Sequence, residues 1–83
     1  MTHEDIVKRL REIMQSATRE AVDWDSVTEA TAIGALGFDS LSILDLMYDV
    51  QQALGIEFDA VELVHLKTVG DLVSFLEARV AAA

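Results

Sequence analysis

Apolar residues recur at helical spacing in three segments of this 83-residue chain, a pattern that strongly restricts its fold. In the first segment, about residues 3 to 18, they fall on one face of a helix. The second, about residues 40 to 54, is apolar over most of its circumference, and the third covers about residues 68 to 80. Val and Ile do not alternate with polar residues, and no Asn-Gly or Asp-Gly hairpin turn is present. We therefore expect an all-α protein.

Polar residues mark where these helices should begin and end. Three pairs have the spacing of a capping residue and its acidic partner: Thr2 and Asp5, Asp59 and Glu62, and Thr68 and Asp71. The middle pair predicts one or two helical turns within residues 56–66. Gly55 suits the left-handed position that ends a helix. The simplest architecture is a bundle of four helices whose third member is short.

Residues 19–38 have no clear periodicity and read as a long loop between the first two helices. A loop of this length is unusual in a small domain unless it is held in place or functional. Its apolar residues are the expected points of attachment to the core: Trp24, Val27, Ile33 and Leu36.

Length and composition limit the class of protein. Residues 1–83 should form one domain, with room for a single core. The absence of cysteine excludes disulfides and thiolate metal ligands. The acidic amino terminus lacks the apolar core of a secretion signal, and no stretch reaches the roughly 18 apolar residues of a membrane span. We expect a soluble, cytoplasmic protein.

Negative charge dominates the chain, with 15 acidic against 6 basic residues and a net charge of -9. This charge repels nucleic acids and anionic membranes, so the expected partners have basic surfaces. No Lys or Arg occurs between Arg19 and Lys67, whereas ten acidic residues do. The acidic stretch is either a solvated surface or a docking face for Lys and Arg side chains, and it brackets Ser40.

Ser40 is the residue that points most directly to a function. It lies in the sequence Leu-Gly-Phe-Asp-Ser-Leu at 36–41, where the loop gives way to the second helix. Asp39 is a plausible N-cap, which places the Ser40 hydroxyl in the first turn, beside unpaired backbone N–H groups and the positive end of the helix dipole. An esterified phosphate is favoured at such a position.

Other roles for this serine fit less well. Its surroundings are not the Gly-x-Ser-x-Gly of a serine hydrolase, and the only histidines are His3 and His65, so we expect no catalytic residue. Residues 23–34 lack the Gly and Glu of a calcium loop, and we expect no defined metal site; loose binding of Ca²⁺ or Mg²⁺ to the clustered carboxylates, which would relieve their repulsion, stays open. A non-covalent acidic helical module, in which Asp39 and Ser40 merely cap a helix, is the alternative of a different class.

Residues 36–41 resemble the Leu-Gly-x-Asp-Ser-Leu signature of acyl carrier proteins, and the similarity covers nearly the whole chain. It includes the amphipathic first helix, the long loop, the aliphatic helix after the serine and the turn at Gly55. The resemblance implies a stand-alone, monomeric four-helix carrier that is not an enzyme. It implies that a magnesium-dependent phosphopantetheinyl transferase moves 4′-phosphopantetheine from coenzyme A to Ser40, where the thiol of the arm holds an acyl group as a thioester.

The resemblance also assigns roles to other residues. Asp39 and Leu41 flank the cofactor site, Asp39 helping the transferase and its magnesium to engage, and Gly37 allows a close turn before the helix. An acyltransferase or ligase, a ketosynthase and other basic-surfaced biosynthetic enzymes are the implied partners. Surplus apolar residues of the second helix would line any pocket for an acyl chain. The residues expected on or near the docking surface are Leu41, Asp45, Met47, Asp49 and Glu62.

Three features of the sequence depart from the pattern of fatty-acid carriers. Ser42 stands where an acid usually follows the serine by two places, residues 51–53 replace an acidic run, and Ala35 replaces a frequent acid. These differences favour a carrier for polyketide, antibiotic or related secondary-metabolite biosynthesis, with a fatty-acid synthase carrier as the alternative. The Phe-Asp before Ser40, rather than Gly-Gly or Gly-His, disfavours a peptidyl carrier.

Overall fold

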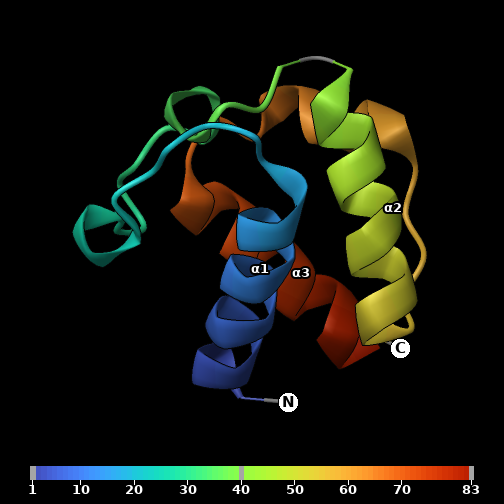
Figure 1. The fold of residues 1–83 in the computed structure, drawn as a ribbon. Coiled ribbons are helices and arrows are strands. Elements are labelled where there is room, and N and C mark those ends of the chain that lie inside the picture. Colours follow the sequence, from blue (N-terminus) through green and yellow to red (C-terminus); the bar gives the residue numbers. More distant parts are fainter. Residues whose placement is uncertain (1, 40, 83) are drawn as a thin grey trace.

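The computed structural model describes residues 2–39 and 41–82, and the regular elements in these two ranges are all helical (Figure 1). The α-helices are α1 (His3–Ala17), α2 (Ser42–Leu54) and α3 (Val69–Ala82). Between them lie three short 3₁₀ helices, η1 (Trp24–Ser26), η2 (Ile33–Leu36) and η3 (Ala60–His65). The all-α prediction is confirmed. The predicted short third helix is η3, which is a 3₁₀ helix rather than an α-helix.

The helix ends follow the capping signals in the sequence. At α1, the Asp5 N–H donates to Thr2 Oγ1 over 3.1 Å, and the Thr2 N–H donates to Asp5 Oδ2 over 3.0 Å. Thr68 and Asp71 form the same reciprocal pair at α3. Gly55 ends α2 with φ at 66°, in the left-handed region that favours glycine. These bonds satisfy backbone groups that helix ends otherwise leave unpaired.

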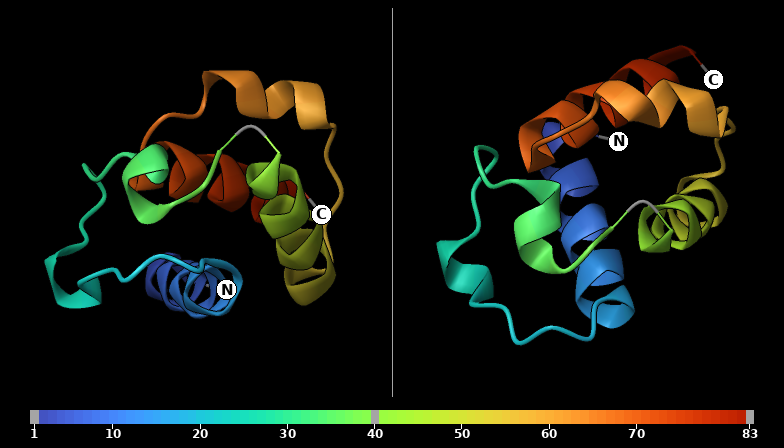
Figure 2. Two further views of the ribbon diagram at one scale, coloured as in Figure 1. Left: turned by 45° about the horizontal axis from the view of Figure 1, so that its top comes forward. Right: turned by 90° about the horizontal axis from the view of Figure 1, so that it is seen from above.

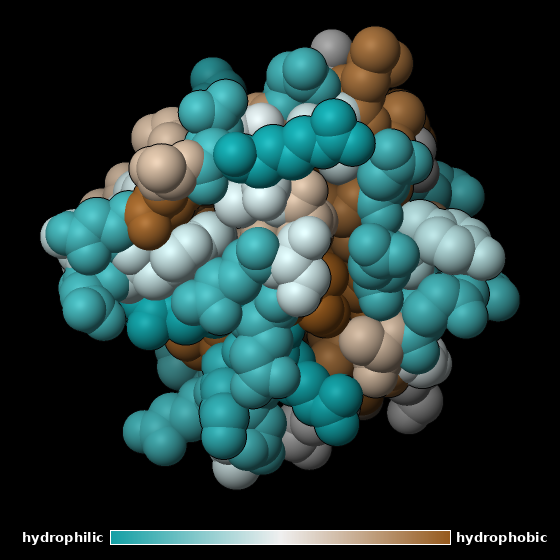
Figure 3. Space-filling view, viewed as in Figure 1, coloured by the Kyte–Doolittle hydropathy of each residue, from teal (hydrophilic) through white to brown (hydrophobic). Residues whose placement is uncertain are grey.

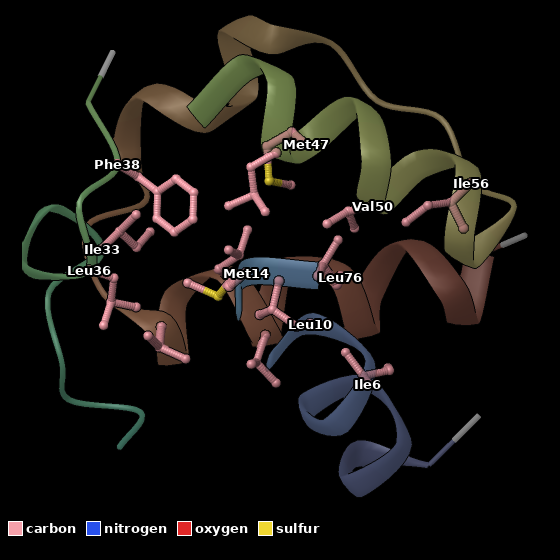
Figure 4. Close-up of a cluster of buried hydrophobic side chains, with 14 residues drawn as sticks. Ile6, Leu10, Met14, Ile33, Leu36, Phe38, Met47, Val50, Ile56 and Leu76 are labelled. Carbon is pink, nitrogen blue, oxygen red and sulfur yellow. The ribbon is translucent and has the colours of Figure 1, made fainter. Parts of the chain in front are cut away.

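The core lies where α1 packs against both α2 and α3. Figure 4 shows Leu10, Val50 and Leu76, one from each α-helix, pointing toward one another. All three are at most 2% exposed, and no buried polar or charged side chain occurs among the described residues. Truncating such a leucine to alanine typically costs about 2–5 kcal/mol, a large part of the stability of a small domain.

The long loop contacts this core through the four apolar residues expected to do so. Ile33 and Leu36 are buried, and Trp24 and Val27 are half-buried against the core. The Thr18 hydroxyl also donates to the Leu36 carbonyl over 2.7 Å, which joins the end of α1 to the end of η2. The loop is therefore held in place rather than free in solvent.

Backbone hydrogen bonds join the loop to the start of α3, and we call these three bonds the loop–α3 ladder (Figure 2). The ladder consists of Ile33 N to Lys67 O (2.9 Å), Val69 N to Thr31 O (2.9 Å) and Gly70 N to Glu29 O (2.7 Å). Gly70 permits the closest of these approaches, because a Cβ there would lie 2.9 Å from the Glu29 carbonyl oxygen. Side chains larger than hydrogen at residue 70 would force the two segments apart.

The molecule extends over 34 × 25 × 20 Å. The start of α1 and the end of α3 lie at one end, and the start of α2 lies at the other (Figure 1). Within residues 2–39 and 41–82, every helix is too short or too polar to cross a membrane.

His3 lies between two acidic side chains from other parts of the fold. Its Nδ1 contacts Glu77 Oε1 on α3, and its Nε2 is 3.6 Å from Glu29 Oε2 in the loop. The hydrogen bond with Glu77 is the main cause that raises the pKa of His3 above its ordinary 6.5. The pKa of His3 is higher in the folded state than in the unfolded one. The contact therefore stabilises the folded state fully below about pH 6.5, and this stabilisation is lost as the pH rises through the folded pKa.

We predict that His3→Gln lowers the thermal midpoint at about pH 6 and has a smaller effect at about pH 9, because the contact is lost as the pH rises through the folded pKa of His3. Thermal melts followed by circular dichroism at the two pH values measure this difference. His65→Gln, at an exposed position in η3, is the matched control for the loss of a histidine. An equal effect of His3→Gln at both pH values would contradict the ionic contact.

Candidate functional site at the start of α2

The chain turns sharply at Gly37, between η2 and α2. Gly37 has φ at 92°, in the left-handed region. A Cβ at this position would lie 2.3 Å from Glu20 Cγ and 2.7 Å from Thr18 Oγ1, so both the backbone conformation and the space require glycine. The expected close turn is confirmed. Phe38 then enters the core and Asp39 returns to the surface.

Asp39 caps α2, as predicted. Its Oδ1 accepts the N–H groups of Leu41 (2.9 Å) and Ser42 (2.8 Å), and its carbonyl accepts the Ile43 N–H (3.0 Å). Hydrogen bonds from the Ser42 and Leu41 N–H groups, in that order, lower the pKa of Asp39. The carboxylate is therefore ionised at neutral pH.

Ser42 completes the cap, a role that the sequence analysis missed. Its hydroxyl accepts the Asp39 N–H over 2.9 Å, so the two residues form a reciprocal capping box. The signal was present in the sequence as an Asp-x-x-Ser spacing before an apolar helix. The Asp39 carboxylate also accepts two N–H groups that were expected to be unpaired. An anion at this end of α2 is still favoured by the helix dipole, but it finds fewer free N–H donors.

Ser40 lies outside the described residues. The residues on both sides of it are exposed, and Leu41 is 76% exposed. Apolar side chains gather on the surface over the start of α2 (Figure 3). Exposed apolar surface of this kind is a feature of sites that bind other molecules.

A cleft of about 310 Å³ opens beside Asp39, and we call it the Phe38 cleft. Its apolar walls come from η2, the turn after it, α2, η3, the segment before α3 and the first turn of α3. The apolar residues that line it are Ile33, Phe38, Ile43, Met47, Leu63, Leu66 and Leu72. The remaining lining residues are Gly34, Asp39 and Lys67. Ile43 and Met47 thus line a pocket between the helices, as the surplus apolar residues of α2 predicted.

Comparison with known proteins identifies the family. Residues 8–76 match the family described as the phosphopantetheine attachment site. The acyl carrier protein of Thermotoga maritima is 35% identical over 79 residues, which cover 94% of this chain and 95% of that protein. The meromycolate extension acyl carrier protein of Mycolicibacterium smegmatis is 30% identical over 92% of this chain and 76% of its own length.

A third similarity concerns a much larger protein. A non-reducing polyketide synthase of Aspergillus fumigatus is 39% identical over 54 residues, which are 65% of this chain and 3% of the synthase.

The chain belongs to the acyl carrier protein family. Carriers of this family hold acyl groups on phosphopantetheine and are not themselves enzymes.

The start of α2 fits a phosphopantetheine arm on the geometry described. Asp39 and Leu41, the described residues on either side of position 40, are both exposed, and the Phe38 cleft offers apolar walls beside Asp39. The positive end of the α2 dipole favours a phosphate there.

Three of the expected docking residues of this carrier, Leu41, Asp45 and Asp49, are exposed. Met47 is only 1% exposed, because it lies on the core side of α2. The expectation that Met47 lies on or near the docking surface is therefore wrong, and the residue belongs to the core and to the wall of the Phe38 cleft.

Glu62, the last of the expected docking residues, has partners within the carrier. Its Oε1 forms an ion pair with Arg79 on α3, and its Oε2 accepts the Asp59 N–H over 2.9 Å. Arg79 also lies over the Phe75 ring, 5.3 Å from its centroid. The half-buried Glu62 carboxylate thus holds η3 against α3, which reduces the charge that it offers to a partner.

Leu44 and Tyr48 are exposed apolar residues that were not among the expected docking residues. They are 44% and 62% exposed, and they lie three and seven residues after Leu41. This spacing places all three on one face of a helix, a signal available in the sequence. We define the α2 face as these three residues with Asp45 and Asp49.

We predict that Gly37→Ala lowers the free energy of unfolding by about 1–3 kcal/mol, because alanine is strained at positive φ. Gly34→Ala is the matched control in η2, since no atom lies within 4 Å of its Cβ position. Urea denaturation of both variants measures the difference. Equal stability of the two would contradict the requirement for glycine at residue 37.

Proposed function

We propose that Ser40 is the attachment residue and that 4′-phosphopantetheine is joined to its hydroxyl by a phosphodiester. The supporting observation is the Asp39–Ser42 capping box, which fixes the backbone on both sides of residue 40 at the start of α2. The sequence at 36–41 lies inside the region that matches the phosphopantetheine family. When bound, the arm supplies the thiol that a cysteine-free chain lacks.

Asp39 has two roles in this proposal. Its Oδ1 holds the first turn of α2 through the bonds to Leu41 and Ser42. Its Oδ2 takes no part in those bonds and remains for the magnesium ion that a phosphopantetheinyl transferase brings. The lowered pKa of Asp39 keeps the carboxylate ionised for this contact at neutral pH.

The proposal is tested by intact mass after incubating the apo protein with coenzyme A, Mg²⁺ and a broad-specificity phosphopantetheinyl transferase. Wild type should gain the mass of one arm, and Ser40→Ala should gain none. Ser74→Ala, which removes an exposed serine of α3, is the control and should be modified like wild type. An adduct on Ser40→Ala, or none on wild type, would sink the assignment.

We further propose that partner enzymes dock on the α2 face. It combines three exposed apolar side chains with two acids, and the chain has no Lys or Arg between Arg19 and Lys67. Such a face is complementary to a surface that offers basic side chains around an apolar centre. The phosphopantetheinyl transferase, an acyltransferase or ligase, and a ketosynthase are the partners of this kind.

Reversing one charge on the α2 face should slow docking at low salt. We expect Asp45→Lys or Asp49→Lys to lower kcat/KM of the transferase for the carrier roughly 2- to 10-fold and to flatten its dependence on salt. Asp25→Lys, at an exposed position in η1, makes the same change in net charge away from α2 and is the control. Equal effects of the η1 and α2 variants would mean that only net charge matters.

For the pathway, we propose polyketide or related secondary-metabolite biosynthesis, with a fatty-acid synthase as the alternative. The α2 face has only two carboxylates, and Ser42, at a position where fatty-acid carriers usually have an acid, is engaged in the Asp39 cap. Enzymes whose basic surfaces are adapted to a strongly acidic α2 would make fewer ionic contacts with this α2 face. The mass of the acyl group on the carrier isolated from its own host distinguishes the two pathways.

A further inference from the structure

A phosphodiester at the start of α2 would add negative charge to an acidic part of the molecule. Two backbone donors of that helix turn, the Leu41 and Ser42 N–H groups, already donate to Asp39. Asp39 itself contributes a full negative charge, because its pKa is lowered. The start of α2 would then hold two neighbouring anions with fewer free backbone donors, and a cation near this point would relieve their repulsion.

Lys67 is the one basic residue that lines the Phe38 cleft within the described parts of the chain, and Asp39 lines the same cleft. Although 28 positions separate the two residues in sequence, the loop–α3 ladder and the packing of η2 bring them to one opening. The Lys67 side chain is exposed, and the ion pairs found in residues 2–39 and 41–82 do not include it.

The backbone of Lys67 is held from both sides. Its carbonyl accepts the Ile33 N–H over 2.9 Å, and its N–H donates to Asp71 Oδ2 over 3.1 Å. Asp71 is the acid nearest in the chain, and its carboxylate is already engaged by the backbone of Lys67 and Thr68. The backbone of Lys67 is therefore fixed at the cleft, while its side chain is flexible. A flexible side chain that ends in a compact charge is suited to contact a phosphate.

We propose that the Lys67 ammonium pairs with the phosphodiester that joins the arm to Ser40, at the mouth of the Phe38 cleft. This inference depends on the proposed attachment at Ser40. Lys67 acts as a positioning residue: it offsets the new charge beside Asp39 and holds the base of the arm next to the apolar walls of the cleft. Because the pair is exposed, its effect should be modest and sensitive to salt.

The test compares the apo and arm-bearing forms of Lys67→Met, Lys67→Arg, Lys8→Met and wild type. Lys8 is an exposed lysine of α1 that does not line the Phe38 cleft, so its variant controls for the loss of one positive charge. The first readout is the change in thermal midpoint on adding the arm. The second is the ³¹P NMR shift of the phosphodiester, which a merely structural role of Lys67 would not alter.

At low salt, Lys67→Met should make the arm-dependent change in midpoint less favourable than in wild type by roughly 1–4 °C. Lys67→Arg should restore it, Lys8→Met should match wild type, and the difference should vanish at about 1 M salt, where screening acts within about 3 Å. The ³¹P shift should change only in Lys67→Met.

Identical arm-dependent changes and identical ³¹P shifts in Lys67→Met and Lys8→Met would overturn the role of Lys67 and leave the attachment at Ser40 intact. A wild-type protein that accepts no arm would overturn the proposed function and this inference together. Each variant is compared with its own apo form, so that the attraction between the Lys67 ammonium and the Asp71 carboxylate, present without the arm, is subtracted.

Discussion

The loop–α3 ladder is the constraint on which the functional end of this carrier depends. A helix can form its own hydrogen bonds, but a loop must find partners elsewhere for its backbone groups. Here the partners are the residues that lead into α3 and its first turn. By fixing Ile33, the ladder places η2, and η2 in turn places the Gly37 turn and Phe38 before α2 begins. The position of Asp39 thus depends on contacts made by Lys67, Val69 and Gly70, much further along the chain.

Local signals in the sequence were sufficient for most of the fold. The Thr2, Asp39 and Thr68 caps involve residues within a few positions of each other, so their spacing alone identifies them. The sequence did not predict that the third helix is a 3₁₀ helix. The six residues of η3 are too few to distinguish 3.0 residues per turn from 3.6. The ladder has almost no signal, since backbone groups bear no side-chain signature; only Gly70, a glycine inside a helix, hints at a close approach.

The errors at the candidate site have a common cause. Residues of α2 are apolar over most of its circumference, so periodicity cannot tell which side faces the core, and Met47 was placed on the wrong one. Tyr48, its neighbour, is on the exposed side. The pairing of Glu62 with Arg79 joins residues 17 positions apart on different elements, which no local pattern predicts. Tertiary contacts, rather than composition, decide which carboxylates of this acidic chain remain available to partners.

The cap at α2 also affects how the start of this helix can bind an anion. Asp39 stabilises the helix with its own carboxylate, and in doing so it occupies two backbone N–H groups that an anion could otherwise use. Charge at the site is therefore a property of the folded molecule as a whole.

The placement of the two chain ends has a practical consequence. Because the start of α1 and the end of α3 lie opposite the start of α2, a tag, a linker or a larger polypeptide joined at either end would begin far from the start of α2. The carrier can thus be tethered to a surface, or fused in series with other domains, while the start of α2 stays open to proteins that approach from the other side.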